Sequence, residues 1–163
     1  MDYTRINNID NSQGGAEKIY VFPFEKYSPS VISVVDNYLV SFPSSTIYEL
    51  KAFNIDFNED VSESYDQKIS FQLKKILPTD NFKEFASSDW RIIIKDNNGN
   101  FRMLGLTTGL QGKFTKAIGT NRSDFNGYNF NFETKEEISA PFLTNLNDFN
   151  KEFYLQELLQ YTI

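Results

Sequence analysis

The chain of 163 residues contains neither cysteine nor histidine. Without cysteine it can form no disulfide framework and no thiolate metal site. Without histidine it lacks the commonest general base and the commonest metal ligand, which excludes Ser-His-Asp and Cys-His catalytic schemes and histidine-based zinc or iron sites. We therefore expect no catalysis, no cofactor and no metal centre.

Long apolar runs and clusters of basic residues are missing as well. No window approaches the roughly 20 apolar residues of a membrane-spanning helix, and the first residues show no basic stretch followed by an apolar run. This pattern predicts no membrane partner and no export signal. The 16 Lys and Arg residues are scattered and are outnumbered by 22 Asp and Glu, for a formal net charge of −6. Tight nucleic-acid binding is therefore disfavoured, because phosphate contacts need clustered positive charge.

Aromatic side chains are abundant instead. The chain has 16 Phe and 9 Tyr, and 40% of its residues are hydrophobic, which is enough for the core of one domain. Its apolar segments alternate with period two more often than with the helical period, as half-buried strands do. We predict an all-β domain, a mostly antiparallel β-sandwich or barrel, at residues 18–143. A flexible arm at 1–17 precedes it, and a C-terminal extension at 144–163 follows.

A β-hairpin is predicted most clearly at residues 90–106. Two segments rich in branched and aromatic residues, 90–95 and 101–106, flank a turn that contains Asn98 and Gly99. These two residue types tolerate the positive φ that a tight hairpin turn needs.

Further turns and strands follow from the same signals. Asn126 and Gly127 predict a turn before an alternating strand at 128–135. Two short apolar runs within 31–42 predict a second hairpin, and residues 46–57 predict one longer strand with a bulge.

Two helical segments are also predicted. Residues 79–87 are long enough for two turns, with Thr79 or Asp80 as the N-cap. Between about 147 and 160, apolar residues recur at near-helical intervals, which indicates an amphipathic helix or a docking arm. This segment packs either on its own domain or across a neighbouring subunit. The residues of its apolar stripe are Phe149, Phe153, Leu155, Leu158 and Leu159.

Several motifs between residues 14 and 143 occur in a distinctive order. They are Gly14-Gly15 before a strand, the strand-turn-strand around 49–73, the 96–99 turn, Leu104-Gly105-Leu106 with Gly109-Leu110, Gly119-Thr120 with Ser123-Asp124-Phe125-Asn126-Gly127-Tyr128, and Ala140-Pro141-Phe142. In this combination the chain resembles a family of small structural proteins of tailed bacteriophages, most of all the tail tube proteins.

The resemblance implies a virion protein of the phage tail, made in the host cytoplasm. Subunits of this kind self-assemble into stacked, hexameric rings, contact other tail or neck proteins, and form a conduit that DNA passes without adhering. The hydrophobic tail after Leu143 departs from the pattern and leaves open a role as a neck connector or tail terminator subunit.

A group of acidic residues lies around the turn between the strands predicted near 46–57 and 67–77. These carboxylates have three interpretations: a solvated hairpin tip, a lumen-facing surface that repels DNA phosphates, or a calcium site. The calcium interpretation lacks the spacing and the glycine of an EF-hand. The residues are Asp56, Glu59, Asp60, Glu63 and Asp66.

Two other classes of function remain as alternatives. A tail-tip module that binds a receptor or a carbohydrate would expose a cluster of aromatic side chains around Trp90 or Tyr128. A glycoside hydrolase would need two facing carboxylates.

Overall fold

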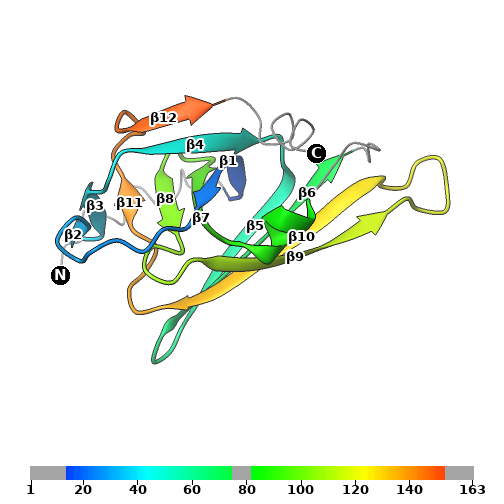
Figure 1. Cartoon of the computed structure of the whole chain (residues 1–163). Coiled ribbons are helices and arrows are strands. Elements are labelled where there is room, and N and C mark those ends of the chain that lie inside the picture. The colour runs from blue at the N-terminus through cyan, green and yellow to red at the C-terminus, as the bar shows by residue number, and fades with distance from the viewer. Residues whose placement is uncertain (1–13, 75–81, 153–163) are drawn as a thin grey trace.

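The computed structural model describes residues 14–74 and 82–152. Its regular structure is almost entirely β, which confirms the predicted all-β fold (Figure 1). One short helix, α1 (Lys83–Ser87), lies within the segment predicted as helical, and positions 79–81 are outside the described residues. The strands are β1 (Ala16–Pro23), β2 (Ser33–Val35), β3 (Tyr38–Ser41), β4 (Ser45–Leu50), β5 (Phe53–Val61), β6 (Tyr65–Lys74), β7 (Asp89–Asp96), β8 (Phe101–Leu104), β9 (Leu110–Ala117), β10 (Gly127–Glu136), β11 (Phe142–Leu143) and β12 (Phe149–Glu152).

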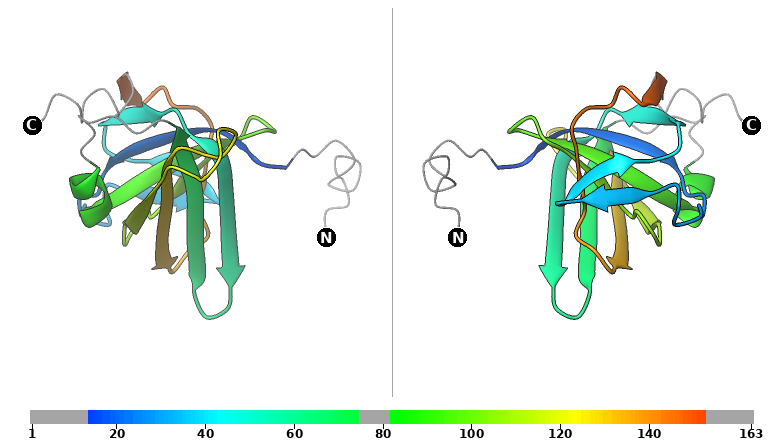
Figure 2. Two further views of the ribbon diagram at one scale, coloured as in Figure 1. Left: turned by 90° about the vertical axis from the view of Figure 1, so that its right-hand side faces the viewer. Right: turned by 90° about the vertical axis from the view of Figure 1, so that its left-hand side faces the viewer.

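Strand pairing divides the fold into two mostly antiparallel sheets. Sheet I has the order β12-β4-β1-β7-β8-β11-β3-β2. Sheet II has the order β9-β10-β6-β5. The sheets join where Asp89 and Trp90 of β7 pair with Gln111 and Leu110 of β9. Figure 2 shows the β5–β6 hairpin of sheet II extending beyond the rest of the domain.

Alternation along the strands builds two hydrophobic cores. Ile19 and Val21 on β1 belong to the first core, which fills the space between sheet I and the inner face of sheet II. Tyr20 points the other way, into the second core. There, the ring centroids of Phe42, after β3, and Phe149, on β12, lie 5.9 Å apart. Since these residues come from opposite ends of sheet I, the sheet curls around the second core.

Helix α1 closes one end of the first core with aromatic contacts. The ring centroid of Phe85 lies 4.8 Å from that of Trp90, and the centroid of Phe82 lies 4.8 Å from that of Tyr128. Trp90 and Tyr128 are only 8% and 1% exposed. Neither of these two side chains is therefore available to an exposed aromatic cluster of the kind that a tail-tip binding module would present.

The single strand predicted at 46–57 is wrong. The chain forms two strands there, β4 and β5, which separate at Lys51 and Ala52 and belong to different sheets. Asn54, with a φ of 52°, accompanies a register shift at the start of β5. The change of phase in the sequence thus marks a corner between sheets as well as a bulge.

In the segment predicted as a C-terminal helix or arm, the helix is wrong over the described residues. Phe149–Glu152 forms β12, which pairs in parallel with β4. Phe149 is 8% exposed and packs against Phe22 of its own domain, at 6.0 Å between centroids. Short apolar segments do not distinguish helix from strand by period alone, and here the edge of β4 offered a partner. Phe153, Leu155, Leu158 and Leu159 lie outside the described residues.

The two hairpins predicted at 31–42 and 90–106 are present. Asp36 and Asn37 both have positive φ in the β2–β3 turn, and Gly99 has a φ of 84° in the β7–β8 turn, which also contains Asn98. These are the positions at which the turn chemistry requires the left-handed region.

The turn predicted at 126–127 lies elsewhere. Gly127 is the first residue of β10, and a Cβ there would stand 2.0 Å from the carbonyl oxygen of Leu73. The reversal occurs at 120–124, where the carboxylate of Asp124 accepts hydrogen bonds from the N–H groups of Asn121 and Thr120, each at 2.7 Å. These hydrogen bonds lower the pKa of Asp124.

Residues 105–109, which we call the junction loop, carry the chain from sheet I to sheet II. Arg91 is 1% exposed and donates to the carbonyl of Leu106 through Nε (3.0 Å) and Nη2 (2.9 Å), and to the carbonyl of Glu25 through Nη1 (2.8 Å). Its guanidinium lies 4.3 Å from the ring centroid of Phe24. Burial lowers the pKa of Arg91, but from so high a value that the group stays charged.

The other two buried polar side chains of the described chain hold the same loop. Gln67 accepts from the N–H of Gly105 through Oε1 at 2.9 Å. The carboxylate of Glu136 accepts from the N–H groups of Thr107 (3.2 Å) and Thr108 (2.9 Å), and from the hydroxyl of Thr107. Strands of both sheets are thereby fixed to one loop.

We predict that Arg91→Met lowers the free energy of unfolding by about 3 kcal/mol, because it removes the guanidinium donors from the buried Leu106 carbonyl and the partly buried Glu25 carbonyl. Arg91→Lys should recover only part of this loss, since an ammonium cannot span both carbonyls. Lys95→Met, a change of a half-buried lysine on the same strand whose partner is the surface carboxylate of Glu17, is the control and should shift the value by less than about 0.5 kcal/mol. Urea denaturation measures all three, and an Arg91→Met midpoint equal to that of the wild type contradicts the prediction.

Candidate assembly surface

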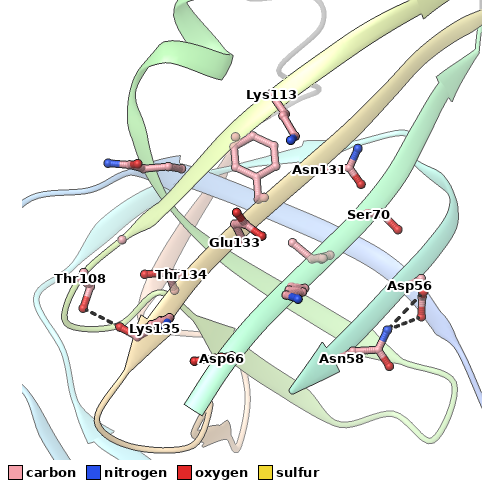
Figure 3. Close-up of a pocket in the computed structure, with 16 residues that line it drawn as sticks. Asp56, Asn58, Asp66, Ser70, Thr108, Lys113, Asn131, Glu133, Thr134 and Lys135 are labelled. Carbon is pink, nitrogen blue, oxygen red and sulfur yellow. Dashed lines mark hydrogen bonds between the residues drawn. The ribbon is translucent and has the colours of Figure 1, made fainter. Parts of the chain in front are cut away.

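A shallow groove of about 820 Å³ lies on the outer face of sheet II (Figure 3). Its outward side chains are polar without exception, because every second residue of these strands faces away from the aromatic core. In β10, for example, Phe130 and Phe132 face the core, whereas Asn131, Glu133 and Lys135 face outward. The other outward residues around the groove are Asp56, Asn58, Asp66, Lys68, Ser70, Gln111 and Lys113.

Charges of opposite sign alternate across this face. Lys68 on β6 lies opposite Glu133 on β10, and Asp66 lies opposite Lys135. Asp60 stands directly opposite Asp66 near the end of the β5–β6 hairpin. The face is therefore mixed in charge, and the acidic group singled out from the sequence forms only part of it.

Amide side chains continue the groove toward the other end of the sheet. Asn54 donates through Nδ2 to Oε1 of Gln72 at 2.7 Å, and Gln72 donates through Nε2 to Oδ1 of Asn129 at 2.8 Å. This ladder joins β5, β6 and β10 across their outer face. It fixes the orientation of neutral donors and acceptors beside the charged rows.

The five acidic candidates divide into three groups. Asp56, Asp60 and Asp66 are on strands and face outward, so the acidic loop is shorter than predicted. Glu63 lies in the turn between β5 and β6. Glu59 faces inward, because it alternates with its neighbours along β5.

Glu59 is an internal anchor. Its carboxylate accepts from the hydroxyl of Ser139 (2.5 Å), the N–H of Ala140 (3.0 Å) and Nε2 of Gln67 (3.2 Å). It thereby ties the segment between β10 and β11 to the hairpin. Its carboxylate therefore binds within the domain and is not part of the outward acidic surface.

Sequence reasoning missed the lysines that balance the outer acids, and also the amide ladder. A signal for both was present, since the outward positions of β10 are uniformly polar while the inward ones are aromatic. The cross-strand partners depend on register, which the sequence did not define.

The two edges of sheet II lack strand partners. β6 pairs along one side of β5, and no described strand pairs along its other side. β9 pairs with β7 only at Leu110 and Gln111, so from Gly112 onward its outer edge has no strand partner in the described part of the chain. Unpaired N–H and C=O groups along a strand edge are a template for pairing with another chain.

Two features are absent from residues 14–74 and 82–152. No three acidic side chains there gather in an arrangement that could hold a metal ion. No helix in these ranges has the length and apolar character needed to cross a membrane.

Comparison with known proteins gives no relative. No protein-family model, no curated protein and no solved structure matches the chain. The outer face of sheet II therefore has to be interpreted from its chemistry. It offers an extended hydrogen-bonding and charged surface between two edges that lack strand partners in the described part of the chain, with α1 lying beside β9.

We predict different effects for two neighbouring carboxylates. Glu59→Ala should lower the free energy of unfolding by about 2 kcal/mol, because three donors lose their acceptor. Asp60→Ala should change it by less than about 0.5 kcal/mol, since this side chain is exposed and faces the like charge of Asp66. Thermal unfolding of both variants provides the comparison, and equal effects would show that Glu59 is not an anchor.

Proposed function

We propose that the chain is a structural protein of a tailed-phage virion, a tail tube subunit that self-assembles into rings around a DNA conduit. The observation that carries the proposal is sheet II: the outward side chains that line its groove are all polar, and its edge strands β5 and β9 have long stretches without a strand partner among the described residues. An edge-to-edge contact between copies would extend this face into a continuous wall. The motifs that resemble phage tail proteins support the same proposal.

Sheet II has an even number of antiparallel strands, and this suits an edge-to-edge contact between copies. β5 runs antiparallel to β6, β6 to β10, and β10 to β9, so β5 and β9 run in opposite directions. If copies are related by rotation about an axis along the strands, β9 of one copy meets β5 of the next in antiparallel orientation. The pairing between copies then has the same geometry as the pairing within one copy.

Side chains on the two edges are complementary in charge. One row across the sheet reads Asp56, Ser70, Asn131 and Lys113 from β5 to β9. In a ring without stagger, Lys113 of one copy lies beside Asp56 of the next. An opposite-charge pair between neighbouring strands stabilises their register.

The chemistry of the outer face fits a conduit for DNA. Lys68 and Lys135 are each opposite a carboxylate, so they form no continuous basic track for phosphates. A wall of alternating charges and amides neither holds a polyanion tightly nor presents an extended apolar surface to it. DNA passes along such a wall without adhering.

Engineered cysteines test the lateral contact, because the natural chain has none. Lys113→Cys is combined in turn with Asn54→Cys, Asp56→Cys and Asn58→Cys. The three pairs test three relative positions of β9 along the β5 strand of the neighbouring copy. Within one copy β5 and β9 are separated by two strands, about 14 Å, which is too far for a disulfide. We expect mild oxidation of at least one pair to give a ladder of covalent oligomers that ends at the ring size.

The control pair is Lys113→Cys with Val40→Cys, an exposed position on β3 of sheet I. Negative-stain electron microscopy of the oxidised product shows whether the oligomers are closed rings. A ladder in the control, or none in the three test pairs, overturns the proposed ring. Single closed rings that never stack would favour the neck connector or tail terminator role over the tube.

A further inference from the structure

The two ends of sheet II differ in charge, and each carries an exposed aliphatic side chain. Val61, at the β5–β6 tip, is 65% exposed, and Ile118, at the β9–β10 tip, is 73% exposed. They are the two most exposed large hydrophobic residues of the described chain. We call these ends the Val61 tip and the Ile118 tip.

The Val61 tip is acidic. Asp60 precedes Val61, Glu63 lies in the turn, and Asp66 stands directly opposite Asp60. Like charges directly opposite each other on neighbouring strands are unfavourable. Lys135, opposite Asp66, offsets only part of this negative charge.

The Ile118 tip is basic. Lys116 is the last exposed residue of β9, and Arg122 lies exposed in the turn that follows. Lys74 is the last residue of β6, at this same end of sheet II. The one carboxylate in the turn, that of Asp124, already accepts hydrogen bonds from the loop backbone and from the Thr120 hydroxyl. Positive charge therefore exceeds negative charge at this end of sheet II.

We infer that copies of the chain stack head to tail along the strand axis, with the Val61 tip of one copy seated on the Ile118 tip of the next. The occupant of each tip is a second copy because one molecule carries both halves of the contact, opposite in charge and each centred on an aliphatic residue. This inference rests on the proposed function and specifies how rings contact one another. The unfavourable pair of Asp60 and Asp66 gains cationic partners in the stack.

A second cysteine pair tests this axial contact separately from the lateral one. Val61 and Ile118 lie at opposite ends of ten-residue strands, about 30 Å apart, so a disulfide between them forms only between copies. We expect oxidised Val61→Cys/Ile118→Cys full-length protein to give covalent chains longer than dimers. The control pair, Val40→Cys with Ile118→Cys, should give none.

Charge reversal shows whether the tips recognise each other. In the Val61→Cys/Ile118→Cys background, Glu63→Arg should lower the yield of covalent chains several-fold, and adding Arg122→Glu should restore it. Salt at 1 M, where the Debye length is about 3 Å, should lower the yield of the parent pair.

The outcomes separate this inference from the proposed ring. Chains from the axial pair without a ladder from the lateral pairs would retain head-to-tail stacking and overturn the ring. A lateral ladder without axial chains, or a yield that charge reversal leaves unchanged, overturns the axial contact.

Discussion

The fold depends on burying a polar loop at the point where two sheets separate. The junction loop must leave sheet I and enter sheet II inside the domain, where unpaired N–H and C=O groups are costly. The chain meets this constraint with three buried polar side chains, Arg91, Gln67 and Glu136, each of which binds backbone of the loop. Arg91 comes from sheet I and the other two from sheet II. The orientation of the outer face of sheet II relative to sheet I thus depends on this set of hydrogen bonds.

Local chemistry made the fold class and the tight hairpins predictable. Asn37 and Gly99 occupy positive φ, and alternation along β10 separates aromatic from polar residues, so turn and period arguments apply directly. The buried state of Trp90 also follows the general tendency of large aromatic residues. What these arguments provide is a list of strands with an inner and an outer face.

The remaining errors have a common cause. Where the local sequence suits two structures equally well, pairing with a distant strand determined which of them forms. Phe149 suits a helical stripe and an edge strand equally well, and the edge of β4 decided in favour of the strand. Glu59 and Asp60 look alike in sequence, but alternation in β5 places one against Ser139 and the other in solvent. Strand register determined which lysines lie opposite which acids, and a shift of one residue would move every side chain of the strand to the opposite face of the sheet.

The edges of sheet II favour one mode of association over the others. Natural proteins keep exposed edge strands short, as this chain does with β2, which has three residues, yet β5 has nine and β9 has eight. Pairing β5 with β5 would bring Asp56 and Asp60 toward carboxylates of the same kind, and pairing β9 with β9 would bring Lys113 on the outer face toward the like charge of the second copy. Only β5 with β9 brings opposite charges together. Such a contact joins two different surfaces, so it propagates from copy to copy and ends only when rotation closes a ring.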